Sequence, residues 1–154
     1  KKLVLYFILI VLVVFSSCST NYYEKSYEIK EKKWSSDEIF QFNVEISDNS
    51  KPYNMYINIK NSTDYFHSNV FLFVNVMYPD NTVYRDTVEG ELADYRGQWL
   101  GKGNSNYKTN KFLYKRNVFF PSTGTYVFAI QHAMRDEFLS GILNIGLEVE
   151  KIKN

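Results

Sequence analysis

Side chains suited to acid–base, nucleophilic or metal chemistry are few in this 154-residue chain. A zinc site needs three or four nitrogen or sulfur ligands, and the chain has two histidines, His67 and His132. Its sequence contains no nucleophile-elbow, phosphate-loop or dinucleotide motif. Carboxylates could pair for glycosidase-type catalysis, and the candidates are Asp64, Asp86, Asp94 and Asp136. Scattered loop carboxylates are ordinary in a domain of this composition, so the sequence predicts no enzyme, no metal site and no cofactor.

The single cysteine, Cys18, has the clearest chemical role. It follows two lysines, an unbroken apolar run over residues 3–15, and two serines. This is the layout of a secretory signal, and the run is shorter than the ~20 residues of a membrane-spanning helix. Ser-Ser-Cys resembles a bacterial lipobox, whose cysteine receives diacylglycerol and becomes the new N-terminus, although Phe15 stands where leucine is usual. We expect residues 1–17 to be a signal peptide and Cys18 to be lipidated; the alternative is a plain signal peptide with an incidental cysteine.

The rest of the chain, residues 18–154, has the length of one domain and can bury a core without disulfides. Its charge is nearly balanced: the whole chain has 18 Lys and Arg against 17 Asp and Glu, and two of the lysines, Lys1 and Lys2, belong to the signal. Nucleic acid is therefore not an expected partner. Thirteen tyrosines and twelve phenylalanines favour strands. We expect residues 18–36 to be a lipidated tether that leads into the domain, and residues 37–154 to form an all-β domain.

Alternation of apolar and polar residues locates the strands. It is strict over residues 40–46 and 53–60, which predicts half-buried antiparallel strands. Residues 70–78 are apolar on nearly both faces, which predicts a central strand covered on both sides, with Phe73 as its most sensitive core position. Further strands are expected at 83–88, 112–120, 125–132 and 145–149, and one helical turn is expected at 134–140. The prediction is a single antiparallel β-sandwich, either jelly-roll or immunoglobulin-like.

A glycine-rich stretch, residues 89–111, interrupts this pattern and is longer than a hairpin needs. Its aromatic residues argue against disorder. Trp99 could plug the end of the sandwich, anchor a partner protein, or form a sugar platform with Tyr95 and Tyr107. The candidate partner-contact residues are Asp94, Tyr95, Arg96, Gly97, Trp99, Leu100 and Gly101.

Short motifs occur in a recognisable order at residues 16–18, 51–59, 86–89, 92–94, 97–103, 121–126, 134–135 and 141–142. Together they resemble the gliding-motility lipoprotein family GldH over essentially the whole mature chain. Gly90 replaces a cysteine associated with the family's Asp-Thr-Leu-Glu stretch. The resemblance implies a non-catalytic, membrane-anchored accessory of the gliding motility and type IX secretion machinery.

The implied partners are the membrane, through acylated Cys18, and protein components of that machinery. The residues after Cys18 are not acidic enough for a surface-display signal, which favours a lipid-anchored envelope protein that faces the periplasm. The alternative function is a glycan-binding envelope lipoprotein that uses the aromatic loop as its platform.

Overall fold

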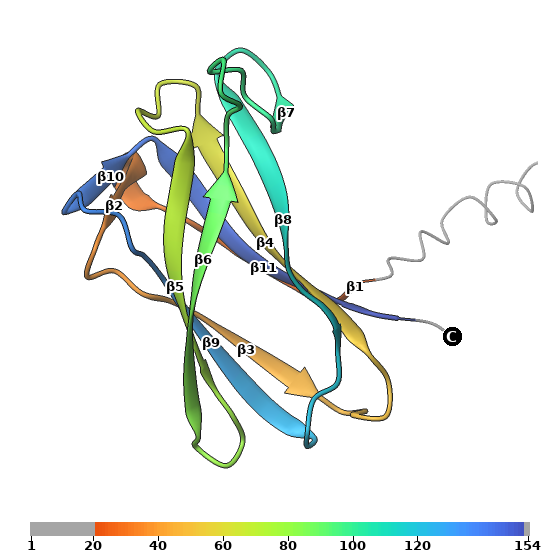
Figure 1. Cartoon of the computed structure of the whole chain (residues 1–154). Coiled ribbons are helices and arrows are strands. Elements are labelled where there is room, and N and C mark those ends of the chain that lie inside the picture. Colours follow the sequence, from red (N-terminus) through yellow and green to blue (C-terminus); the bar gives the residue numbers. More distant parts are fainter. Residues whose placement is uncertain (1–20, 153–154) are drawn as a thin grey trace, which may run out of the picture.

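The computed structural model describes residues 21–152, which form two antiparallel sheets packed as a sandwich (Figure 1). The five-stranded sheet has the order β1 (Asn21–Glu28), β11 (Ile142–Lys151), β4 (Tyr53–Ser62), β8 (Tyr107–Val118) and β7 (Lys102–Gly103). The four-stranded sheet has the order β3 (Phe40–Ile46), β9 (Gly124–His132), β5 (Asn69–Met77) and β6 (Val83–Glu91). A small pair, β2 (Lys33–Ser35) with β10 (Phe138–Ser140), and a 3-10 turn (Lys30–Lys32) complete the described chain. The predicted all-β sandwich is confirmed.

The core forms from the apolar half of each alternating strand. In β3 and β4 every second side chain is buried, as the sequence pattern predicts. Phe42, Ile57 and Phe128 are among the buried side chains that the two sheets contribute to the space between them. Trp34 is fully buried at the end of this core, and its indole N–H donates to the Glu38 carbonyl at 3.0 Å.

Strand β5 buries only one of its two apolar faces. Leu72 and Val74 lie in the core, whereas Phe73 is half-buried on the outer face of the four-stranded sheet, with the Arg85 guanidinium 4.6 Å from its ring. The prediction that Phe73 lies in the core was wrong. No third layer of the described chain covers that outer face, so β5 is central within its sheet and yet half exposed.

Residues 134–140 do not form the predicted helical turn. They approach β2 instead, and β10 pairs with it through Leu139 and Trp34. Gly141, expected to stop a helix, has a φ of +98° and joins β10 to β11. Its N–H donates to the Lys32 carbonyl at 2.9 Å, so pairing with distant residues replaces a local helical turn.

The two long seams of the sandwich differ. Residues 21–28, in the stretch expected to be a tether, form edge strand β1 here, and its tyrosines close one seam onto β3. Tyr22 Oη donates to the Glu45 carbonyl at 2.8 Å, and Tyr27 Oη donates to the Gln41 carbonyl at 2.6 Å. The opposite seam, between β6 and β8, is more open and is bridged by the Lys115–Asp86 ion pair at 2.6 Å.

The connections gather at two ends of the sandwich. In Figure 1 the β4–β5 connection and residues 92–106 lie at the upper end, and the β3–β4 and β8–β9 connections lie at the lower end. Over residues 21–152, no helix has the length and apolar character needed to cross a bilayer.

Candidate functional site

Residues 89–111, expected to form one long loop, include the end of β6, the short strand β7 and the start of β8, so the irregular segments between them are short. Strand β6 continues to Glu91, and an isolated bridge pairs Ala93 with Trp99. The Leu100 N–H donates to the Leu92 carbonyl at 2.9 Å, which closes the loop at its base. Leu92 is fully buried, and its N–H donates to the Ser68 carbonyl at 2.7 Å. Residues 92–100 therefore form a compact hairpin-like loop fixed to the β4–β5 connection.

Asp94 organises the tip of this loop. Its Oδ1 accepts from the Arg96 N–H at 2.9 Å and from the Gln98 N–H at 2.8 Å. Its carbonyl accepts from the N–H of Gly97, whose φ of +78° is a left-handed conformation that glycine adopts at little cost. An Asp–x–x–Gly turn of this kind holds its own backbone in place. Asp94 and Gly97 thus shape the loop from within.

The loop presents large side chains to solvent at its tip and at its base. Tyr95 is 88% exposed, and Leu100 is 55% exposed. The Arg96 Nε donates to Tyr95 Oη at 2.8 Å, and the guanidinium lies 5.1 Å from the tyrosine ring. Trp99 is different, because it is half-buried and packs against the hydrophobic core. The loop is therefore fastened by Trp99 and exposes Tyr95, Arg96 and Leu100.

A further exposed ring at the same end was not expected from the sequence. Phe66 in the β4–β5 connection is 92% exposed. That connection is fixed to its neighbour, since Thr63 Oγ1 donates to the Ser105 carbonyl at 2.8 Å. The sequence gives no local signal for this, because Phe66 follows Tyr65, another aromatic residue, which is buried. We refer to Phe66, Tyr95, Arg96 and Leu100 as the distal surface.

The three rings considered for a sugar platform have different surroundings. Trp99 packs inward and Tyr95 stands in solvent beside Arg96. Tyr107 lies on β8, where the Lys60 ammonium is 3.9 Å from the centre of its ring. Stacking on a sugar requires free ring faces that line up, so this arrangement does not favour the platform.

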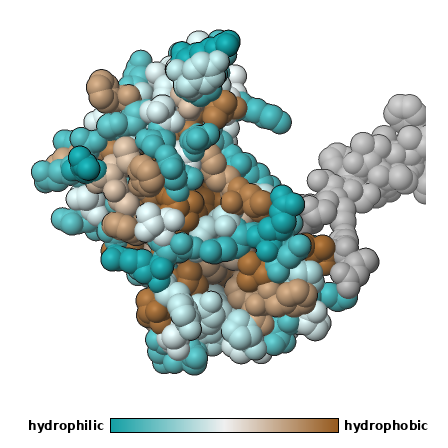
Figure 2. All heavy atoms as spheres, viewed as in Figure 1, coloured by the Kyte–Doolittle hydropathy of each residue, from teal (hydrophilic) through white to brown (hydrophobic). Residues whose placement is uncertain are grey.

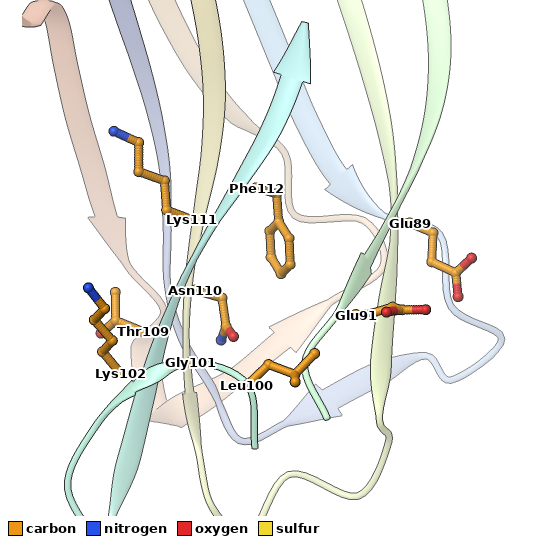
Figure 3. Close-up of a pocket in the computed structure, with 9 residues that line it drawn as sticks. All are labelled: Glu89, Glu91, Leu100, Gly101, Lys102, Thr109, Asn110, Lys111 and Phe112. Atoms are coloured by element: carbon orange, nitrogen blue, oxygen red, sulfur yellow. The ribbon is translucent and has the colours of Figure 1, made fainter. Parts of the chain in front are cut away.

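An open groove of about 870 Å³ runs beside the loop, along the seam between β6 and β8. Its lining residues are Glu89, Glu91, Leu100, Gly101, Lys102, Thr109, Asn110, Lys111 and Phe112. Figure 3 shows Leu100 and the Phe112 ring between the two strand edges, with the glutamates directed away on the β6 side and the lysines on the β8 side. The groove thus has an apolar floor and charged rims of opposite sign.

Two glycines permit the close packing around this groove. A Cβ on Gly90 would lie 2.9 Å from Phe112 Cε2, and a Cβ on Gly101 would lie 2.7 Å from Asn110 Oδ1. Gly90 therefore makes room for a phenylalanine ring. Sequence reasoning placed Gly101 among the contact residues, whereas the structure gives it a packing role beside buried Asn110.

One charged residue of the groove, Lys111, belongs to an ion network with two glutamates of β11. Lys111 Nζ lies 2.9 Å from Glu148 and 3.0 Å from Glu150. Burial opposes the charge of Lys111, but hydrogen bonds to both glutamates raise its pKa overall. The hydrogen bond from Lys111 in turn lowers the pKa of Glu150. Both shifts favour the charged forms of Lys111 and Glu150, as expected for an ion network and not for a proton-transfer site.

The acid–base candidates have separate partners. Asp86 pairs with Lys115, whose hydrogen bond lowers the pKa of that carboxyl, and Asp136 lies 2.7 Å from His67. Asp94 is occupied by its loop, and Asp64 accepts from its own loop's Ser62. His132 is buried, neither ring nitrogen has a hydrogen-bond partner, and burial lowers its pKa. In the part of the chain that the structure describes, no three His, Cys, Asp or Glu side chains are placed to hold a metal ion.

The family model for the GldH lipoprotein matches residues 21–149, nearly all of the described chain. The chain belongs to the GldH lipoprotein family. Membership makes it a lipoprotein, anchored by lipid in the cell envelope, and a homologue of gliding motility lipoproteins. The residues that would carry the lipid, Cys18 and the signal peptide at 1–17, lie outside the described range.

Two relatives agree with this membership. The gliding motility lipoprotein GldH homolog of Christiangramia forsetii is 35% identical over 93% of this chain and 92% of its own. Gliding motility lipoprotein GldH of Flavobacterium johnsoniae is 28% identical over 94% of each chain. Neither name, nor that of the family, describes an enzyme.

Similarity to solved structures is weaker. The Yersinia pseudotuberculosis-derived mitogen has a TM-score of 0.38 and 9% identity, over 86% of this chain and 88% of its own. TmCBM61 in complex with beta-1,4-galactotriose has a TM-score of 0.32 and 11% identity, over 86% of this chain and 90% of its own. Neither likeness is strong enough to bear on the function of a GldH-family protein.

Proposed function

We propose that the protein is a non-catalytic accessory lipoprotein of the gliding motility and type IX secretion machinery, lipidated at Cys18 and facing the periplasm. Its task is to hold a protein component of that machinery at the membrane. The family and its two relatives support the setting. The distal surface supports the mode of action.

One observation carries this proposal: two neighbouring connections, each fixed by backbone hydrogen bonds, hold large side chains in solvent at one end of the sandwich. Tyr95 and Phe66 are about nine-tenths exposed, and Leu100 more than half, on connections fixed by backbone hydrogen bonds. Tyr and Arg are enriched among residues that dominate binding at protein interfaces. A tip that is already ordered loses little conformational freedom on binding, which favours affinity.

The groove beside the loop extends the same surface. Leu100 belongs to both, and Glu91 and Lys102 place charges of opposite sign on the two rims of the groove. A protein interface usually has an apolar centre that is surrounded by a polar rim. Glycan binding remains the alternative proposal, with the polar groove residues rather than an aromatic platform as its support.

The test compares two pairs of serine substitutions in the lipidated protein. Tyr95→Ser with Leu100→Ser alters the distal surface, and Val83→Ser with Tyr84→Ser is the control. Each control residue is 58% exposed on β6, away from the loop. We expect the distal pair to lose co-purification of the secretion machinery and to impair secretion, while its melting temperature stays at the wild-type value.

Normal secretion by the distal variant, with its complex intact, would refute the proposed contact. Equal losses in both pairs would show that general surface properties, and not this site, determine the phenotype. Binding of the purified domain to envelope polysaccharide, lost in the same distal variant, would support the glycan alternative instead.

A further inference from the structure

The chain between the lipid and the fold is very short. If Cys18 is lipidated, as the proposed function assumes, Asn21 at the start of β1 is three residues away. At ~3.6 Å per residue the two cannot be more than about 11 Å apart. A headgroup layer is itself ~5–8 Å thick. The end of the sandwich where β1 begins must therefore lie at the membrane surface.

The structure shows which other segments share that end. Asn21 pairs with Glu150 near the end of β11, and Tyr22 Oη bonds to Ser47 in the β3–β4 connection at 3.0 Å. That connection is joined to the β8–β9 connection, because Asn49 Nδ2 donates to the Pro121 carbonyl at 3.3 Å. These connections lie together at the lower end in Figure 1, and in Figure 2 hydrophobic residues lie among hydrophilic ones at this end.

Two adjacent phenylalanines at this end point in opposite directions. Phe120 is buried, with its ring centre 5.4 Å from that of Tyr53 and 4.6 Å from that of Tyr126. Phe119, its neighbour, is 61% exposed. Asn117, just before them, has a φ of +53° and donates its N–H to Asn54 Oδ1, at an irregularity in the β4–β8 register. This bulge and the buried ring fix the outward position of Phe119.

The nearby charges are compatible with a lipid surface. Asp48 is neutralised by Lys151 at 2.6 Å, and hydrogen bonds from Lys151 and Ser50 keep the pKa of this carboxyl well below its usual range. Arg116 is exposed three residues before Phe119. Asp80, at the tip of the β5–β6 hairpin, is an exposed carboxylate that opposes binding to an anionic surface. An exposed aromatic ring beside an arginine suits the headgroup region, where apolar and charged contacts are both available.

We propose that this end of the sandwich docks on the bilayer that holds the lipid anchor, with Phe119 in the headgroup layer and Arg116 on lipid phosphates. The domain then stands upright. Its longer strands have ten residues or more at ~3.3 Å each, which places the distal surface about 30 Å from the membrane. The anchor and the docked end together orient the partner site; the lipid alone would leave the domain free to tumble.

The single cysteine of the chain allows a direct test. When lipid occupies Cys18, a cysteine introduced by Phe119→Cys is the one free thiol and takes an environment-sensitive NBD label. The lipidated protein is reconstituted into vesicles of phosphatidylethanolamine and phosphatidylglycerol that contain nitroxide-headgroup lipid. Mass spectrometry first confirms the lipid on Cys18. Phe66→Cys, labelled in the same way at the opposite end, is the matched control.

We expect a blue-shifted emission and strong nitroxide quenching at position 119, with neither at position 66. Adding Arg116→Glu should reduce the quenching at position 119. Equal quenching at both positions, or none at either, would show a freely tumbling domain and overturn the proposal. Quenching that depends on protein density in the vesicle would mean that a second copy covers this end, which would also overturn it. Failure to find lipid on Cys18 would count against the proposed function instead.

Discussion

Removal of the Asp94 side chain should loosen the distal loop without unfolding the domain. The carboxylate accepts two backbone hydrogen bonds, from Arg96 at 2.9 Å and Gln98 at 2.8 Å. At about 1 kcal/mol each for partly exposed bonds, Asp94→Ala should cost the loop about 2 kcal/mol of local stability. That corresponds to a roughly 30-fold larger population of the open loop. The buried Leu92 and the packed Trp99 should keep the rest of the sandwich intact.

Amide hydrogen exchange measures this effect residue by residue. Exchange at Arg96 and Gln98 should accelerate by about the same factor as loop opening, while amides in β4 and β11 keep their wild-type rates. Asp94→Asn is the matched control, since its side-chain oxygen can still accept and most of the protection should remain. Unchanged exchange at the tip would refute the role given to Asp94. A loss of protection throughout the sandwich would show that the loop is part of the global fold.

Three further results are expected. Leu72→Ala should lower the free energy of unfolding by about 2–5 kcal/mol, and Phe73→Ala on the outer face by less than half as much, measured by denaturant titration. Gly90→Ala should cost about 1–3 kcal/mol because its Cβ would clash with the phenylalanine ring 2.9 Å away; unaltered stability would contradict that packing. Burial lowers the pKa of His132, so at mildly acidic pH this histidine is protonated more readily in the unfolded chain than in the folded chain. The free energy of unfolding should therefore fall as the pH drops below about 6.5. His132→Leu should flatten this dependence.

The strands that alternate strictly were the predictable part of the fold. Residues 40–46 and 53–60 behave as expected because one face of each meets the opposite sheet and the other meets solvent. Residues 70–78 also alternate between buried and more exposed positions, but phenylalanines occupy the solvent-facing positions. The sequence therefore looks apolar on both faces, and the prediction of a strand covered on both sides was wrong. The composition of one strand does not show whether another layer covers its sheet, because that depends on how all the strands of the domain are arranged.

Other features depend on contacts between residues far apart in sequence. Residues 21–28 look polar, yet they add a strand because β11 offers a free edge and their tyrosines reach β3. Residues 138–140 form strand β10 because they pair with β2, which lies about a hundred residues earlier in the sequence. In the candidate site, the exposure of Tyr95 and Leu100 followed from the glycine-rich pattern. The inward packing of Trp99 and the exposure of Phe66 depend on the neighbouring connection and could not be read from local spacing.

The central claim is that the distal surface contacts a protein of the gliding and secretion machinery, and site-specific photo-crosslinking in living cells tests it most directly. A photoreactive amino acid replaces Tyr95 in one strain and Thr87, an exposed residue on β6, in another. We predict one dominant adduct from position 95 with a component of the machinery, absent from position 87 and lost on Leu100→Ser. Identical adducts from both positions, or none from position 95 in cells that secrete normally, would contradict the account.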